Sequence, residues 1–188
     1  MRKAVPFAIA AAIAIPAIAA PESFTVDPRH TFPSFEVSHL GFSTQRGRFN
    51  KTSGKIALDR AANTGSVDIV IDTASLDTGL DKLEEHLRGE DFFNVAKYPT
   101  MFFRSSAVSF KGDVPVAADG ELTMLGVTKP VTLTITSFAC GVHPISKKDT
   151  CGADATASIL RSDFGMKYAL PAVGDTVKLL IQVEATRD

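Results

Sequence analysis

Alternation of apolar and polar residues is the feature of this sequence that most restricts its fold. In the clearest stretch, Val131 to Phe138, Leu133 and Ile135 alternate with threonines. The stretch from Val177 to Ala185 repeats the pattern, with Leu180 as an apolar exception. A period of two is typical of a β-strand with one buried face. Many such runs, separated by short turns rich in Gly, Asn and Asp, predict an antiparallel all-β sandwich or barrel.

The apolar phase of these runs predicts what lies inside the domain. It consists of Phe, Val, Ile, Leu and Met, with few charges. A closed barrel of about eight strands is either just filled by such side chains or holds one ligand, and the alternation does not decide between the two. The candidate residues for the lining of a ligand-binding lumen are Phe35, Val37, His39, Phe49, Ile69, Ile71, Phe92, Met101, Phe103, Met124, Ile159, Phe164 and Ile181.

One segment breaks the period of two. Leu80, Leu83 and Leu87 fall at the spacing of a single helical stripe. The Asp77-Thr78 pair offers side chains that cap helix starts. The sequence therefore predicts a short helical segment at about 79–95, near the mouth of the barrel, before the next strand begins.

The position of Phe102 is a puzzle within that next strand. Neighbouring residues of a strand face opposite sides, so Met101 and Phe103 should point inward and Phe102 outward. One interpretation is an isolated exposed aromatic, which is common on protein surfaces. The other is that an apolar element such as Phe93, or a partner chain, covers it.

The first nineteen residues have the pattern of a secretory signal peptide. Basic residues at Arg2 and Lys3 precede an apolar run from Ala4 to Ile15, and Ala17-Ile18-Ala19 matches a cleavage site. We expect cleavage after Ala19, which leaves residues 20–188 as a single exported domain. No transmembrane segment is expected in that mature chain.

The two cysteines predict a disulfide. Cys140 and Cys151 are the only cysteines in the sequence, and an even number in an exported chain favours a bond between them. A metal or redox site is the weaker alternative, because the spacing is not CxxC and only His143 lies nearby.

Other chemistry has little support in the sequence. The chain has 20 basic and 21 acidic residues and no basic cluster, which argues against nucleic-acid binding. Its four histidines form no HxH or HExxH pair, and no phosphate- or dinucleotide-binding glycine motif occurs. Asp81, Glu84 and Glu85 are expected to form a solvated helix face. We therefore predict no catalytic residue, no metal site and no required cofactor.

Four blocks of the sequence resemble the YceI-like family. The first is DPRHTFPSFEVSHLGFSTQRGRF, from Asp27 to Phe49, and the second runs from Ser75 to Phe103. The third is LTMLGVTKPVTL, and the fourth runs from Ser158 to Ala185 with Asp163-Phe164-Gly165. Together they span almost all of the expected mature chain.

The resemblance implies an antiparallel eight-stranded, lipocalin-like β-barrel with helical cover. It also implies export to the periplasm and an elongated apolar cavity for a long isoprenoid chain, such as a polyprenyl lipid or a quinone tail. Some members of the family are dimers, so the resemblance suggests a second copy of this chain as a partner, and no enzymatic activity is a family trait. This sequence departs from the family at Leu83, where Asp is frequent, at Leu125, where Arg is frequent, and at Phe102, which is usually polar.

The leading hypothesis is therefore a periplasmic binding or carrier protein that holds an isoprenoid lipid in its lumen. A first alternative is a small exported enzyme that uses the lumen as a substrate pocket, with His39, His86 and Arg161 as its best residues. A second is a filled barrel that binds a protein partner through Phe102 and Leu180 on its outer surface.

Overall fold

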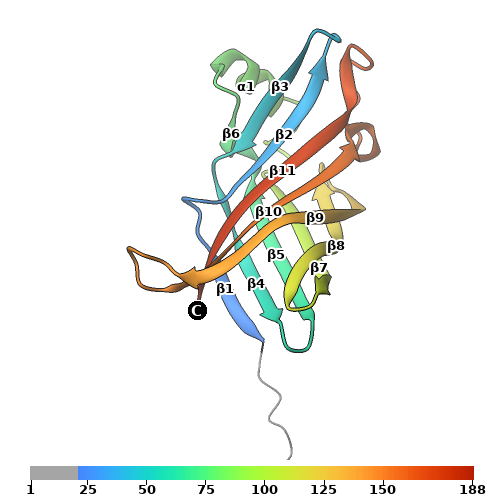
Figure 1. Cartoon of the computed structure of the whole chain (residues 1–188). Coiled ribbons are helices and arrows are strands. Elements are labelled where there is room, and N and C mark those ends of the chain that lie inside the picture. The colour runs from blue at the N-terminus through green and yellow to red at the C-terminus, as the bar shows by residue number, and fades with distance from the viewer. Residues whose placement is uncertain (1–20) are drawn as a thin grey trace, which may run out of the picture.

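The chain folds into one antiparallel sheet with a short helix (Figure 1). The computed structural model describes residues 21–188, so the predicted signal peptide and its cleavage site lie outside the described residues. The strands are β1 (Glu22–Val26), β2 (Phe32–His39), β3 (Ser43–Phe49), β4 (Thr52–Asp59), β5 (Thr64–Asp72), β6 (Leu76–Asp77), β7 (Thr100–Lys111), β8 (Val114–Met124), β9 (Val127–Val142), β10 (Asp149–Leu160) and β11 (Val173–Arg187). The helix α1 spans Asp81–Arg88, and the 3-10 turns are η1 (Thr73–Ser75) and η2 (Arg161–Phe164).

The sheet closes into a barrel because β1 pairs with both β4 and β11. β1 and β2 both pair with β11, so together they occupy one position in the ring. β4 pairs with β1 and β3 pairs with β2, so β3 and β4 together occupy the next position. Together with β5, β7, β8, β9, β10 and β11, these make a ring of eight strands. The predicted eight-stranded antiparallel barrel with one short helix is confirmed.

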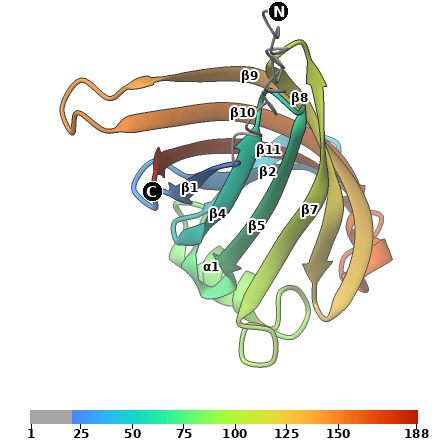
Figure 2. The same cartoon turned by 90° about the horizontal axis from the view of Figure 1, so that it is seen from below.

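The β9–β10 hairpin projects beyond the barrel wall (Figure 2). β8 pairs with β9 no further than Thr134, whereas β9 and β10 remain paired as far as Val142. Cys140 and Cys151 lie opposite each other in this projecting part and form a disulfide. The predicted disulfide is confirmed, and it joins β9 to β10 where β8 no longer supports β9.

Helix α1 begins in a different way from the one predicted. Its first residue follows Leu80, which makes no capping hydrogen bond with its side chain, so the prediction of a cap at Asp77-Thr78 is wrong. Instead, the Glu84 carboxylate reaches back and accepts hydrogen bonds from the backbone N–H groups of Thr78 (2.8 Å) and Gly79 (3.2 Å). The hydrogen bond from Thr78, followed by the one from the Arg88 side chain, lowers the pKa of Glu84.

Arg88 fastens the other end of α1 to the barrel. Its guanidinium donates to the carbonyl oxygens of Ala74 (3.0 Å) and Leu76 (2.6 Å) and to the Glu84 carboxylate (3.1 Å). Glu84 is thus a largely covered anchor, and its expected place on a solvated helix face is wrong. No helix in the described part of the chain is long and apolar enough to cross a bilayer.

Aromatic side chains close the interior beneath α1. The turn after the helix places Phe92 and Phe93 inside the barrel, where both are buried. The Phe93 ring packs edge-on against Phe49, with centroids 5.5 Å apart, and lies 6.5 Å from the ring of Phe35. This packed end of the core fixes the position of the helix over the barrel.

Phe102 lies on the outer face of β7, as its place in the alternation predicts. The guanidinium carbon of Arg104 sits 5.0 Å from the centre of its ring, a distance typical of a cation–π contact. Arg104 also donates to Asp68 on β5 at 3.1 Å. Phe102 is therefore half-covered by a neighbouring cation of its own strand, and Phe93 points into the barrel instead.

Candidate functional site

Many inward-facing side chains of the barrel are only partly buried. Along β9, Val131, Leu133 and Ile135 alternate with exposed threonines, yet they keep part of their surface accessible. The inward residues Met101 and Phe103 of β7, by contrast, are buried. An inward side chain with accessible surface faces an empty space, and the lumen indeed contains a cavity of about 300 Å³. The filled barrel, one of the two alternatives, is not what this chain forms.

The cavity wall includes most of the residues selected from the sequence. Those that line it are Phe35, Val37, His39, Phe49, Ile69, Ile71, Phe92, Met101, Phe103, Met124, Ile159 and Ile181. That these side chains contact a ligand remains a prediction.

Phe164 is the exception, and its expected place on the cavity wall is wrong. The chain leaves the strand conformation at Arg161 and enters the turn η2, so the period of two no longer applies to Phe164. Its ring is buried within the packed core instead.

Several wall residues were not selected from the sequence. Leu133 and Leu179 follow the same alternation as the selected residues, so the pattern contained the signal for them. Leu83 and Leu87 of α1 also line the cavity, whereas Leu80 is exposed to solvent. The helical spacing puts all three leucines on one face of a helix. Leu80, however, precedes the first helical residue, Asp81, and its side chain does not face the cavity.

Four polar wall residues lie at the end of the cavity that α1 covers. They are His39 on β2, Gln45 and Arg46 on β3, and Thr78 just before the helix. The wall also contains the polar residues Thr31, Ser34, Thr52 and Arg161. Gln45 and Arg46 are also exposed to solvent, unlike the other wall residues. The cavity therefore reaches the surface beside this part of β3.

The opening exists because β3 has a free edge there. β3 pairs with β2 from Ser43 to Arg48, but on its other side it pairs with β6 only at Arg48 and Phe49. Among the described residues, no strand pairs with Ser43–Gly47 on the side of β3 opposite β2. Helix α1 lies beside this unpaired edge (Figure 1). We call this gap between the free edge of β3 and α1 the portal.

Arg161 organises a loop at the same end of the barrel. Its guanidinium is 3% exposed and donates to the carbonyl oxygens of Met166, Tyr168, Val173 and Gly174 at 2.8 to 3.1 Å. Burial lowers the pKa of this arginine. With its donors directed at backbone carbonyl groups, Arg161 stabilises this loop, and it also forms part of the cavity wall.

Aromatic contacts join α1 to the loop that Arg161 organises. The imidazole of His86 packs edge-on against Phe92, with centroids 5.0 Å apart, and against Tyr168 at 5.3 Å. His86 Nε2 also lies 3.3 Å from the Asp91 carboxylate. Of the three best residues for an enzyme, His86 and Arg161 thus have partners of their own, and no hydrogen bond between described residues joins His39, His86 and Arg161 to one another.

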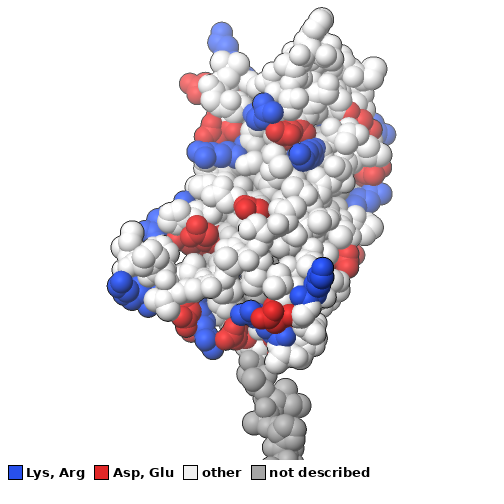
Figure 3. Space-filling view, viewed as in Figure 1, with Lys and Arg blue, Asp and Glu red and all other residues white. Residues whose placement is uncertain are grey.

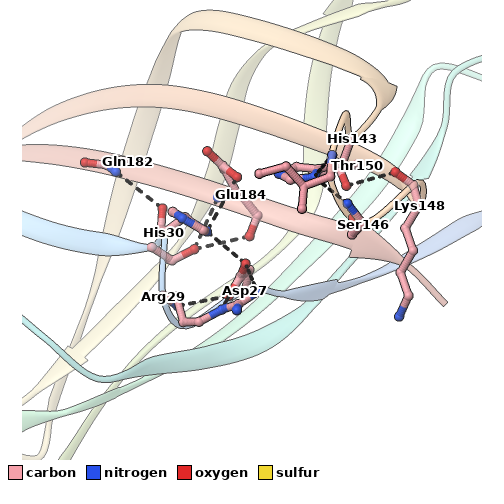
Figure 4. A network of polar contacts seen from close by, with 11 residues as sticks. Asp27, Arg29, His30, His143, Ser146, Lys148, Thr150, Gln182 and Glu184 are labelled. Atoms are coloured by element: carbon pink, nitrogen blue, oxygen red, sulfur yellow. Dashed lines mark hydrogen bonds and ion pairs between the residues drawn. The ribbon is translucent and has the colours of Figure 1, made fainter.

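The two remaining histidines belong to networks on the outside of the barrel (Figure 4). His30 Nδ1 lies 2.9 Å from the carboxylate of Asp27, whose pKa is lowered chiefly by the side chain of Arg29. His143 Nδ1 accepts hydrogen bonds from the backbone N–H groups of Ile145 and Ser146 in the β9–β10 turn. Within residues 21–188, no group of three or more His, Cys, Asp or Glu side chains is placed to hold a metal ion.

Comparison with known proteins agrees with this architecture. The family model of the YceI-like domain matches residues 24–185. The chain belongs to the YceI-like family. A UPF0312 protein of Pseudomonas aeruginosa is 37% identical over 174 residues, which is 91% of this chain and 89% of that protein.

Solved structures of the same fold also resemble the chain. Burkholderia cenocepacia BcnA superposes with a TM-score of 0.71 at 27% identity, over 86% of this chain and 99% of the BcnA chain. A polyisoprenoid-binding domain from Saccharophagus degradans, implicated in plant cell wall breakdown, gives a TM-score of 0.67 over 89% of this chain and 99% of its own. At 17% identity, the second likeness concerns the fold alone. The family model and these solved structures therefore place the chain in the YceI-like family and in its barrel fold.

Proposed function

We propose that this protein is a periplasmic carrier that holds one long isoprenoid chain, such as a polyprenyl lipid or a quinone tail, in the barrel lumen. The observation that carries the proposal is the cavity of about 300 Å³ with an almost wholly apolar wall. A volume of this size lies within the range of ordinary ligand pockets. An apolar wall offers few hydrogen bonds, so its occupant must be recognised by shape and hydrophobic burial.

Energetics favour a carrier that releases its ligand. Removing one five-carbon unit from water is worth about 4 kcal/mol, at about 0.8 kcal/mol per carbon. Summed over a long tail, this would exceed the tightest known affinities, so water is the wrong reference. The tail is already dry in a bilayer, and the preference for the lumen over the membrane is therefore small.

Native mass spectrometry of protein purified without detergent, combined with organic extraction, tests the proposal. We expect one isoprenoid molecule per chain, and we expect stripped protein to take up one equivalent of an added prenyl alcohol. Repeated ligand-free preparations that also fail to take up prenyl lipids would contradict the proposal.

A pair of neighbouring substitutions tests where the ligand lies. Leu133 faces the cavity, whereas Thr134 is exposed on the outer face of the same strand. An unpaired amide buried against an alkyl chain costs about 1–3 kcal/mol, so Leu133→Gln should weaken retention about tenfold or more. Thr134→Gln should leave it unchanged. Equal retention by both variants would exclude the lumen as the binding site.

A further inference from the structure

The rim of the portal carries exposed apolar side chains on three separate segments. The turn between β2 and β3 exposes Leu40 and Phe42, and Phe42 is 90% exposed. Leu80 is exposed at the start of α1, and Tyr168 is exposed on the loop that Arg161 organises. Single exposed apolar residues need no explanation, but a group of them around an opening does.

Direct contacts hold these three segments together. The backbone N–H of Leu40 donates to the carbonyl oxygen of Ala172 at 2.8 Å, which joins the β2–β3 turn to the loop. The ring contact between Tyr168 and His86 joins the loop to α1. The same three segments supply the cavity-lining residues at this end, so the exposed side chains surround the way into the lumen.

The β2–β3 turn presents its apolar residues at a conformational cost. Leu40 has a φ of 53° and Gly41 a φ of 74°. The left-handed region suits Gly and Asn but disfavours a bulky residue such as leucine. Leu40 and Phe42, two residues apart, both expose apolar surface to solvent. Exposed apolar residues at a conformationally unfavourable turn do not improve solubility or stability, which points to a function at the turn.

The charges of the rim differ between its segments. Residues 38–48 and 165–173 contain no Asp or Glu, and they include Lys167 and two arginines, Arg46 and Arg48, that pair with Glu36 and Asp77. The start of α1, by contrast, exposes Asp81 and Glu85. In Figure 3 the tip of the molecule, which the β2–β3 turn forms in Figure 1, is largely free of charged side chains, whereas the neighbouring part at upper left, where α1 lies, carries both signs. Aromatic and aliphatic residues flanked by a few cations are typical of surfaces that enter the headgroup region of a bilayer.

We propose that this rim docks onto a phospholipid bilayer, so that an isoprenoid chain passes sideways through the portal between membrane and lumen. This proposal rests on the proposed function, to which it adds the surface of exchange. With few basic residues and no polybasic cluster, docking depends mainly on apolar insertion and is weak and reversible.

The absence of tryptophan from the sequence gives a direct test, because one substitution creates one fluorescence probe. Phe42→Trp places it at the rim. Ile145→Trp places it at the tip of the β9–β10 hairpin, and the parent side chains are 90% and 86% exposed. Leu80→Trp provides a second rim probe on a different segment.

Vesicles of phosphatidylcholine, with and without brominated acyl chains, serve as the membrane. We expect the two rim variants to show blue-shifted emission and quenching by the brominated lipid, and Ile145→Trp to show neither. Adding phosphatidylglycerol should change binding little, because the rim carries both exposed acidic residues and cations. Rim probes that stay unquenched, or a hairpin probe quenched as strongly as they are, would overturn the proposal.

Removal of the apolar side chains separates docking from ligand binding. Leu40→Ser with Phe42→Ser should weaken vesicle binding about tenfold for each side chain and slow uptake of a prenyl lipid from vesicles. Uptake of a short prenyl alcohol from solution should not change, and Ile145→Ser should change neither. If vesicle binding survives the double substitution, docking at this rim is excluded, whatever the lumen binds. If the protein docks but takes up no prenyl compound, only the proposed function fails.

Discussion

The same substitution, leucine to phenylalanine, should change the free energy of unfolding in opposite directions at two positions of the barrel. Leu179 on β11 faces the cavity, and it lies opposite Phe35 on one neighbouring strand and Ala157 on the other. Leu76 on β6 is 1% exposed and belongs to the packed core, away from the cavity wall. Leu179→Phe and Leu76→Phe therefore make the same chemical change in an empty and in a filled environment.

The sign of the stability change follows from packing. Forcing extra carbons into a packed core costs typically about 1–3 kcal/mol, so Leu76→Phe should lower the free energy of unfolding by that amount. At Leu179 the larger ring enters free space within the cavity of about 300 Å³. Filling such a space commonly stabilises a protein by about 0.5–2 kcal/mol.

Urea unfolding of lipid-stripped protein, followed by circular dichroism, measures both changes. Leu179→Phe should also reduce the amount of prenyl alcohol that the protein binds, because the ring occupies the same space. If Leu179→Phe destabilises the protein as much as Leu76→Phe does, the lumen is packed in solution and the reasoning is refuted.

Other expectations concern the supports of the site. Arg161→Met should lower the free energy of unfolding by at least about 3 kcal/mol in urea titrations, because hydrogen bonds to a charged group contribute about 1.5–3 kcal/mol each, and Arg161→Lys should cost less. Two hydrogen bonds from Ser162, the side-chain one first, lower the pKa of Asp175 in the folded state. The resulting stabilisation is present at neutral pH and is lost as the pH falls below about 4, so Asp175→Asn should flatten the loss of stability in acid unfolding curves. Cys140→Ser with Cys151→Ser should lower the free energy of unfolding by up to about 3 kcal/mol without changing prenyl retention by mass spectrometry.

Alternation predicted the strands and most of the cavity wall, because the direction of a side chain in a strand depends only on its position along that strand. Leu133 and Ile181 face inward for the same reason that their neighbours face solvent. The emptiness of the lumen could not be predicted in this way. Whether eight strands leave a space depends on their tilt and on which side chains meet across the ring, and the same residue types serve in both cases.

Contacts distant in sequence explain the remaining differences. The acceptors of Arg161 are backbone carbonyl groups of a loop, and backbone groups carry no signal in a sequence. Helical spacing alone puts Glu84 on the solvated face, because it shows neither the backbone donors in the turn before the helix nor the way Arg88 covers the carboxylate. Phe164 lies beyond the end of β10 at Leu160, in the turn η2, where strand alternation gives no guide to the direction of a side chain.

The measurement that tests the central claim most directly is photo-crosslinking with a prenyl chain that carries a diazirine, followed by mapping of the adducts by mass spectrometry. Because neighbouring residues of a strand face opposite sides of the barrel wall, the position of a single adduct tells whether the chain lies inside or outside the barrel. The account predicts adducts on Met101, Leu133 and Ile181, which line the cavity. Adducts on Phe102 and Leu180, the outward-facing neighbours of Met101 and Ile181, would show that the chain binds outside the barrel and would contradict the account.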